Sequence, residues 1–449
     1  MTRITCYGGV AEIGGNKILV EDRDARIWLD MGQSFNFGSD YFTEFLGPRK
    51  RHGLRDLLAL DLMPRTPGLY SQSALGPTSF SWRAPEFSAI FITHVHSDHV
   101  NHLGYVDESI PVHLGEGTLT ILESWSTTSD FANIGEHDFR TFRTGASVDA
   151  DGIDVEPIHV DHSAPAAYGH ILHTSRGAIA YTGDLRRHGP QGRLTDDFIA
   201  AARKAKPIAL ITEGSRVAPE DPRRNLTEAQ VKSGAIDLVQ QAREKLVIVT
   251  FPGRDVDRIR TFSEVAAATG RGFVVDLKTA HLLTTLKRDR RIDVPDFDRD
   301  HHLRAYTRGQ RSNRWESELQ GKLKDRVLTA ADIRAKPGEF IVQLDFWHLT
   351  ELVDLQPPKG SPFIHSKSEP FDEEDISDRV LQNWLDRFGL VRHQLHASGH
   401  MSEAEIADMI RVIAPKVVIP VHTEHPDRFT LFSRRVIQPV KDQPIPLTV

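Results

Sequence analysis

The ten-residue segment THVHSDHVNH at positions 93–102 limits what this chain can fold into more than any other. It follows the apolar run FSAIFI, so four histidines and an aspartate come directly after a predicted buried strand. Alternate residues of a strand share a face, which would let His94 and His96 point together at one ion. Asp98 and His99 follow in the turn and could reach a neighbouring ion. A helix N-terminus capped by Asp98 would explain only one of these five residues.

Other predicted strands also end in a residue that can bind metal. The strand-end candidates are His162, Asp184, Glu213, His396, His400 and His422. Each alone is more often an ordinary turn residue or a hydrogen-bonded histidine. However, the carboxyl ends of strands are where sheet proteins assemble sites from distant positions. The recurrence therefore predicts one shared metal site.

The chain has only one cysteine, Cys6, and 22 histidines. A single cysteine excludes an internal disulfide framework and favours a reducing, cytoplasmic location. It also means that histidines and carboxylates must hold any metal. Such ligands without thiolate suit Zn²⁺, with Mn²⁺ as the less selective alternative.

The net charge of −7 gives no chain-wide basic footprint for nucleic acid. Local basic runs at 47–55, 286–291 and 307–314 are typical of solvated faces. Composition therefore neither supports nor forbids a polyanionic substrate. No apolar run approaches the roughly 20 residues of a membrane helix. The start, MTRITCYGG, has no secretory-leader pattern, so we expect no membrane partner.

The pattern of predicted elements changes along the 449 residues, which are too many for one ordinary core. The first 215 residues alternate short β-branched runs with turn signals, as in two packed sheets, and 33–86 interrupts them as a long surface insertion. From about 225 helices alternate with strands, which predicts a parallel α/β unit. Pro and Gly residues in DLQPPKGSPF end this unit near 372. We expect domains at 1–224, 225–372 and 373–449, the last completing the first.

The H-x-H-x-D-H motif, followed by isolated His and Asp residues at strand ends, resembles the metallo-β-lactamase superfamily. Asp30, in IWLDMG, matches that family's first motif, and Glu213, His400 and His422 resemble the extra motifs of its β-CASP subgroup. GGVAEIGGNK and HASGH are similar to ribonuclease J, particularly its short archaeal-type forms. The resemblance implies an α/β fold: a metallo-β-lactamase αββα sandwich with an inserted parallel α/β β-CASP domain.

The resemblance also implies two divalent metal ions. Their ligands would be His94, His96 and His162 for one ion and Asp98, His99 and His422 for the other, bridged by Asp184. Asp30 would orient the site, Asp98 would help position the attacking water, and His400 paired with Glu213 would be the general acid.

The substrate implied by the resemblance is single-stranded RNA, cleaved by 5′→3′ exonuclease activity, with endonuclease activity as a second mode, in RNA processing and decay. Arg254 and Arg258, near a predicted helix start, would bind backbone phosphates. Residues expected at a terminal 5′-phosphate are Ser366, Ser368, His396 and Ser398. SKSEPFDEE departs from the Ser-rich form usual there, which leaves an ordinary turn open.

Three alternatives remain. A DNA-directed β-CASP nuclease usually carries valine where this chain has His422, which favours RNA. A small-molecule hydrolase would lack the α/β insert of about 150 residues with its arginines. A catalytically inactive RNA-binding scaffold would have lost metal ligands, whereas this chain keeps all of them.

The chain also ends without the C-terminal domain that supports the bacterial ribonuclease J dimer, so a homodimer is left open.

Overall fold

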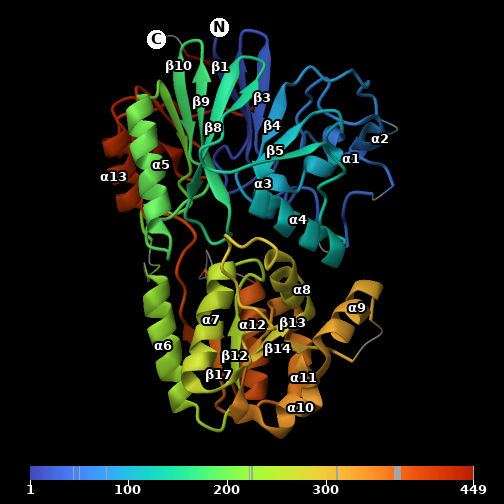
Figure 1. Cartoon of the computed structure of the whole chain (residues 1–449). Coiled ribbons are helices and arrows are strands. Elements are labelled where there is room, and N and C mark those ends of the chain that lie inside the picture. Colours follow the sequence, from blue (N-terminus) through green and yellow to red (C-terminus); the bar gives the residue numbers. More distant parts are fainter. Residues whose placement is uncertain are drawn as a thin grey trace.

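The strand-rich first half of the chain forms two β-sheets that pack face to face. The structure is a computed structural model and describes residues 1–43, 45–49, 51–76, 78–221, 223, 226–309, 312–368 and 376–447. The first sheet has the order β20-β1-β2-β3-β4-β5-β6. Its strands are β1 (Arg3–Gly8), β2 (Lys17–Asp22), β3 (Ala25–Leu29), β4 (Ala89–Phe91), β5 (Val112–Gly115), β6 (Phe139–Phe142) and β20 (Pro444–Pro446). The C-terminal strand therefore lies beside the N-terminal one (Figure 1).

The second sheet has the order β19-β11-β10-β9-β8-β7. Its strands are β7 (Val148–Ala150), β8 (Ile153–Val160), β9 (Ala167–Thr174), β10 (Gly177–Tyr181), β11 (Ala209–Thr212) and β19 (Val418–Pro420). Inward-facing apolar residues of both sheets form one core, in which Ile4, Ile27, Val155, Leu172 and Ile179 are fully buried. Burial of this apolar area is the main force holding the two sheets together.

Helices cover the outer faces of both sheets. On the second sheet lie α5 (Gly192–Ala205) and α13 (Glu403–Ile413), and α13 has the capping box formed by Ser402 and Glu405. On the first sheet lie the short α3 (Ser97–Val100) and the longer α4 (Glu116–Thr128). The layers run helix, sheet, sheet, helix, so the predicted αββα sandwich is confirmed.

The insertion at 33–86 is packed more firmly than the surface segment expected from its composition. It contains α1 (Arg55–Ala59) and α2 (Gln72–Leu75). Its apolar residues Leu54, Leu57, Leu69 and Tyr70 are buried in the same cluster as Ile90 and Val112 of the first sheet. The sequence pattern did not predict these buried residues, because the segment is rich in Gly and Pro and its leucines are too few to show helical periodicity.

The middle of the chain forms a second lobe around a wholly parallel sheet of order β15-β14-β13-β16-β12-β17-β18. Its strands are β12 (Val247–Thr250), β13 (Gly272–Asp276), β14 (Leu303–Tyr306), β15 (Val327–Leu328), β16 (Phe340–Gln343), β17 (Pro362–His365) and β18 (Val391–Gln394). Its helices are α6 (Glu228–Gln241), α7 (Val256–Thr269), α8 (Leu277–Leu286), α9 (Arg314–Leu323), α10 (Ala330–Ala335), α11 (Leu352–Leu355) and α12 (Ile376–Phe388). A capping box of Thr227 and Gln230 begins α6. Alternating strands and helices thus form the expected α/β unit.

This parallel sheet extends beyond residue 372, where the sequence pattern placed its end. Strand β18 pairs in parallel with β17, and α12 connects the two strands. The Pro and Gly residues of DLQPPKGSPF form a turn between α11 and β17, inside the unit. A turn within a parallel sheet and a turn between domains have the same composition, so the sequence could not separate them.

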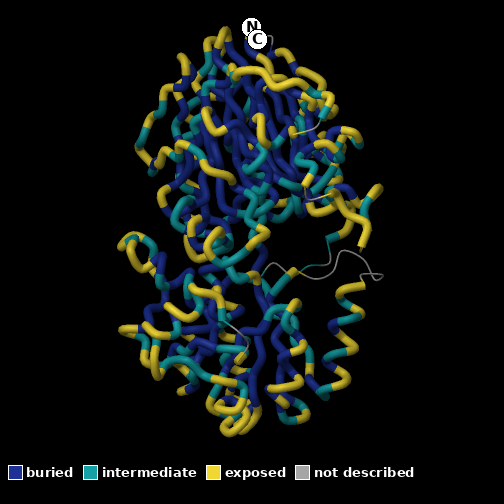
Figure 2. The backbone as a smooth tube through the Cα atoms, turned by 90° about the vertical axis from the view of Figure 1, so that its right-hand side faces the viewer, coloured by how far each residue is buried: buried dark blue, intermediate teal, exposed yellow. Residues whose placement is uncertain are grey.

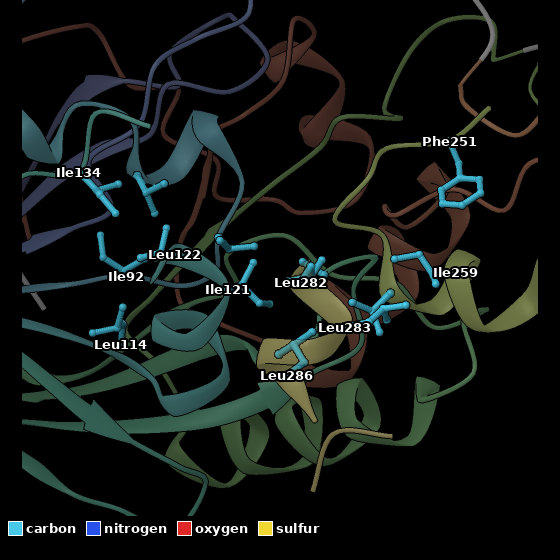
Figure 3. Close-up of a cluster of buried hydrophobic side chains, with 14 of the residues drawn as sticks. Ile92, Leu114, Ile121, Leu122, Ile134, Phe251, Ile259, Leu282, Leu283 and Leu286 are labelled. Atoms are coloured by element: carbon cyan, nitrogen blue, oxygen red, sulfur yellow. The ribbon is translucent and has the colours of Figure 1, made fainter. Parts of the chain in front are cut away.

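The two lobes share one hydrophobic cluster. We call the part built on the two packed sheets the upper lobe and the part built on the parallel sheet the lower lobe, as in Figure 1. Ile121 of α4 in the upper lobe and Leu282 and Leu283 of α8 in the lower lobe are buried together in this cluster (Figure 3). Ser124 of α4 also hydrogen-bonds His281 of α8 at 2.8 Å. Figure 2 shows buried backbone running through the middle of each lobe. Among the described residues, no helix is sufficiently long and apolar to traverse a bilayer.

Candidate metal centre

The strand-end residues singled out by the sequence converge at one edge of the two sheets of the upper lobe. His94 and His96 follow β4, and His162 follows β8. Asp184 follows β10 and His422 follows β19. His94 and His422, 328 residues apart along the chain and following strands of different sheets, therefore both lie 3.6 Å from the Asp184 carboxylate. This is the arrangement that the sequence predicted.

The first group of potential ligands consists of His94, His96, His162 and Asp184, whose ligand atoms all lie within 4.8 Å of one another. His94 Nε2 lies 3.1 Å from His96 Nδ1, and His162 Nε2 lies 3.0 Å from the same atom. Three imidazole nitrogens thus face a common point beside the Asp184 carboxylate.

The second group consists of Asp98, His99, His422 and again Asp184, also within 4.8 Å. His422 Nε2 is 3.0 Å from Asp98 Oδ2, and His99 Nε2 is 3.2 Å from Asp184 Oδ2. All four side chains are buried. Because Asp184 belongs to both groups, its carboxylate lies between two adjacent ligand sets.

The electrostatics of these groups fit divalent cations. Burial and neighbouring imidazoles lower the pKa of His94 and of His162 well below the ordinary value, and burial lowers the pKa of His96 to about 4. Burial opposes ionisation of Asp98, but His99 and His422 still hold its pKa at about 2. Despite burial, the Asp184 carboxylate raises the pKa of His99, and it raises that of His422 to about 9. Because neutral imidazoles and ionised carboxylates are the forms that bind metal, an ion in the second group would displace protons from these two rings. Among the described residues, the buried Asp184 Oδ1 has no hydrogen-bond partner.

Asp30 lies on the side of the His99 ring that is opposite Asp184. Its carboxylate accepts hydrogen bonds from the Thr93 backbone N–H at 2.8 Å and the Tyr181 hydroxyl at 2.7 Å. It also contacts His99 Nδ1 at 2.8 Å, which leaves Nε2 of that ring facing Asp184. A carboxylate on the far nitrogen fixes the orientation and tautomer of a metal-binding imidazole. Thr93 and Tyr181 are supporting residues that the sequence did not reveal.

Two residues of the centre have backbone conformations that are uncommon for their type. Asp30 has φ of 59° and His422 has φ of 53°. Left-handed conformations of residues other than glycine persist where the surrounding contacts hold them, and they concentrate at functional sites. The His422 N–H donates to the Gly9 carbonyl at 2.8 Å, and the Asp30 N–H donates to the Phe91 carbonyl at 2.9 Å. These bonds keep both side chains directed at the site.

A third group lies beside the first two and contains His400 and Glu213. His400 Nδ1 contacts Glu213 Oε2 at 2.8 Å. Burial alone would lower the pKa of His400, yet the charge and hydrogen bond of Glu213 raise it above its ordinary value. The Ser215 hydroxyl donates to Glu213 at 2.7 Å and lies 2.8 Å from His422 Nδ1, linking this pair to the metal ligands. Ser215 was missed because it lies in the turn after β11 (Ala209–Thr212), where strand alternation no longer predicts which way a side chain points.

The two arginines expected to bind phosphate have different environments. The Arg254 guanidinium lies 4.0 Å above the Trp125 ring, and its buried Nε has no hydrogen-bond partner among the described residues. Arg258 is fully buried, pairs with Glu228 at 2.9 Å and donates to the Ala397 carbonyl. Its charge is therefore neutralised inside the protein, which does not fit the phosphate-binding role expected from the sequence.

The start of α7 also differs from the expected phosphate site. Asp255 is the N-cap residue, and its carboxylate accepts the Arg258 N–H at 3.0 Å. A carboxylate already satisfies an N–H group there and repels a second anion. The helix N-terminus therefore adds little to phosphate binding.

The four residues expected around a 5′-phosphate lie near one another after β17 and β18. His396 Nδ1 lies 3.2 Å from the Ser366 carbonyl, and its Nε2 lies 3.4 Å from the Ser368 hydroxyl. Arg258 donates to the Ser366 hydroxyl, and the Ser398 hydroxyl accepts the His400 N–H at 3.1 Å. Ser366 and Ser398 are buried and bonded within the protein, so Ser368 and His396 are the more accessible pair.

Comparisons with known proteins agree with this geometry. The family model described as "Beta-lactamase superfamily domain" matches residues 66–250. Ribonuclease J2 of Bacillus subtilis is 24% identical over 94% of this chain and 69% of its own length. Ribonuclease J of Sinorhizobium meliloti is 25% identical over 75% of this chain, and the match spans 57% of that relative. The matches thus span 57–69% of the length of these two relatives.

A solved structure has the same fold over its full length. The crystal structure of a protein of unknown function from Enterococcus faecalis V583 superposes with a TM-score of 0.79, at 23% identity, over 99% of both chains. The αββα sandwich, the inserted parallel sheet and the strand-end histidines and aspartates occur together in this chain. The predicted resemblance is confirmed: residues 66–250 match the beta-lactamase superfamily domain, and most of the chain is similar to ribonuclease J proteins.

Proposed function

We propose that this protein is a two-metal ribonuclease that hydrolyses phosphodiester bonds of single-stranded RNA. The observation that carries the proposal is the pair of ligand groups that share Asp184. Relatives named ribonuclease J along most of the chain support RNA as the substrate. We further propose 5′→3′ exonuclease action, with endonuclease action as a second mode, in RNA processing and decay.

The residues present fit two divalent ions. His94, His96 and His162 would hold one ion, Asp98, His99 and His422 would hold the other, and Asp184 would bind both. Their imidazole and carboxylate donors favour Zn²⁺, with Mn²⁺ as the alternative. Such ions, when bound, would supply Lewis-acid chemistry, which activates water for attack and stabilises negative charge on phosphoryl oxygens.

The chain's own residues would handle protons and orientation. His400 would hold a proton on Nε2 for the departing 3′ oxygen, because Glu213 and Ser215 contact Nδ1. The raised pKa of His400 supports this role. Asp98 would orient the attacking water, and Asp30 would keep His99 in position.

Substrate phosphates would bind on either side of this centre. We propose Arg254 for a backbone phosphate, because its Nε has no partner among the described residues. We propose Ser368 and His396 for a terminal 5′-phosphate, with Ser366 and Ser398 shaping the loops around them. Arg258, paired with Glu228, would be a positioning residue that holds these loops.

We also propose a division of the chain into domains. The β-CASP insert expected at 225–372 would extend to Gln394, because β18 pairs with β17. Residues 1–224 and the remaining C-terminal part would form the metallo-β-lactamase domain. The cleft between the two would receive the strand.

Competition between nucleic acids tests the proposed function. Labelled RNA and DNA of one sequence are mixed at equal concentration with metal-loaded protein, and we expect RNA to be cleaved faster. Equal or faster cleavage of DNA would favour a DNA-directed nuclease.

Metal analysis tests the same proposal independently and should find two ions per chain. A protein that binds RNA without metal and without cleavage would be a scaffold.

A matched pair of substitutions separates the metal centre from general surface effects. Asp184→Asn should abolish cleavage and reduce the bound metal, because Asp184 belongs to both ligand groups. Asp138→Asn changes an aspartate whose side chain is 58% exposed and should leave both unchanged. Full activity of Asp184→Asn would refute the proposed site.

A further inference from the structure

A cavity of about 720 Å³ lies between the two lobes and reaches the candidate metal centre at His96. Its walls come from α4 of the upper lobe, the loop after β12, the start of α8 and the 3₁₀ helix Phe346–Glu351 of the lower lobe. A volume of this size is within the range of roughly 300–1,000 Å³ of ligand pockets in proteins. None of the four residues expected at the 5′-phosphate lines it. It is therefore a separate part of the cleft.

Three aromatic side chains from different segments line this cavity: Trp125, Phe131 and Trp347. Phe131 is 84% exposed and Trp347 is 79% exposed, while Trp125 is half-buried. Single exposed aromatic residues are normal on protein surfaces, but a group around one cavity indicates a binding surface. Trp347 is held edge-on by Phe346 at a ring-centroid distance of 5.3 Å, which limits its movement.

The charged residues of the cavity leave positive charge available to a ligand. Of the two carboxylates, Asp345 pairs with Lys367 at 3.4 Å, whereas Asp276 keeps its negative charge while it accepts the Thr279 N–H at 2.7 Å as the cap of α8. The cations Arg254 and Lys278 have no ion pair with any side chain in the described part of the chain. An anionic ligand would therefore meet unneutralised cations beside the aromatic rings.

Two polar atoms on the cavity wall also lack partners within the described ranges. They are Arg254 Nε and His348 Nδ1, both shielded from solvent. A buried polar atom without a hydrogen bond is unfavourable, and a bound ligand would relieve this cost. Stacking surfaces, free cations and unsatisfied polar atoms therefore occur together at one place.

We propose that this cavity binds unpaired nucleotides of the substrate strand, with bases stacked on Trp347 and Phe131 and phosphates on Arg254 and Lys278. The stacked bases belong to the part of the strand on the 3′ side of the cleaved bond, because the residues proposed for the 5′ end lie elsewhere. The inference rests on the proposed function and adds to it the residues that select single strands. Paired bases present only their edges to a protein, so a duplex could not use these rings.

Binding of a cleavage-resistant strand tests this inference. The probe is a fluorescein-labelled phosphorothioate RNA of 12 nucleotides, and the dissociation constant Kd is measured by anisotropy with the full-length, metal-loaded protein. Trp347→Ala and Phe131→Ala should each raise Kd about tenfold, within the range for loss of one stacked base. Trp347→Tyr keeps an aromatic face and should change Kd less than about threefold. A duplex of the same sequence should bind at least about tenfold more weakly.

The matched control is Phe45→Ala, which removes a fully exposed phenylalanine that does not line the cavity. Its Kd should equal that of the unaltered protein. Unchanged Kd in both cavity variants, or equal affinity for the duplex, would overturn the stacking inference while leaving the proposed ribonuclease intact. If the unaltered protein bound neither single nor double strands, the proposed function itself would fail. Thermal unfolding of each variant verifies that it is folded.

Discussion

His400 differs from the proposed metal ligands because it lies outside both ligand groups, and its Nδ1 pairs with the Glu213 carboxylate. Glu213 and Ser215 contact that nitrogen at 2.8 and 3.1 Å. The His400 side chain is 26% exposed, whereas those of His94 and His99 are fully buried. This exposure would allow contact with a substrate, so proton transfer is a better role for His400 than metal binding.

Substitution of His400 tests that role. His400→Ala should lower kcat by about 10²–10⁴, the usual effect of losing a general acid. Both ions should remain bound, because His400 belongs to neither of the two proposed ligand sets. The change is measured as single-turnover cleavage together with metal content. His173→Ala, at a histidine that is 45% exposed on β9, is the control and should behave like the unaltered protein. Loss of metal in His400→Ala would instead identify His400 as a ligand.

At the scale of single elements, the strands position the centre through close backbone contacts at their ends. The Gly15 and Asn16 N–H groups donate to the Asp98 carbonyl at 3.0 and 3.2 Å, and the Met31 N–H donates to the His99 carbonyl at 2.8 Å. The loop after β3 thus packs directly against the loop after β4. Gly32 allows this approach, because a Cβ atom there would lie 1.6 Å from the Asp98 carbonyl oxygen.

A methyl group at position 32 should therefore push away the loop that carries Asp98 and His99, although residue 32 is not itself a proposed metal ligand. Gly32→Ala should displace the Asp98 loop, reduce the metal content and lower the free energy of unfolding by about 1–3 kcal/mol, as overpacking does. Metal analysis and denaturant unfolding measure these two effects. Gly47→Ala is the matched control, because nothing lies within 4 Å of its Cβ position. An unaffected Gly32→Ala protein would show that the two loops can separate without cost.

At the scale of the whole molecule, the lobes are joined by a common apolar cluster as well as by the chain. Leu283 of α8 is 1% exposed and lies in the cluster that also contains Leu114 and Ile121 of the upper lobe (Figure 3). Arg186, fully buried, adds ionic contacts to Asp161 of the upper lobe at 3.2 Å and to Asp257 of the lower lobe at 2.6 Å. Both apolar and ionic contacts therefore connect the two lobes.

We therefore expect a core substitution at α8 to destabilise both lobes. Leu283→Ala should lower the free energy of unfolding by about 2–5 kcal/mol, the range for a buried leucine. Hydrogen exchange should show faster exchange in strands of both lobes. Leu431→Ala, at a leucine that is 68% exposed, should change neither quantity. Faster exchange confined to the lower lobe would mean that the lobes unfold independently.

The amino-acid sequence by itself determined the type of site and the residues that form it. Apolar runs followed by His94, Asp184 or His422 are local patterns, because the end of a strand can be predicted from the few residues around it. The αββα sandwich and the parallel insert follow in the same way from the order of strands and helices. The two capping boxes, at Thr227 and Ser402, were also predictable, because each depends on four consecutive residues.

Only the tertiary structure decided which side chains remain available to a ligand. Arg254 and Arg258 are four residues apart, yet one lines the cleft and the other is neutralised by Glu228. The extent of the parallel sheet to β18 depended on strand pairing, and the aromatic cavity depended on bringing α4 beside α8. These properties arise from contacts between residues far apart in the chain, which no local pattern records.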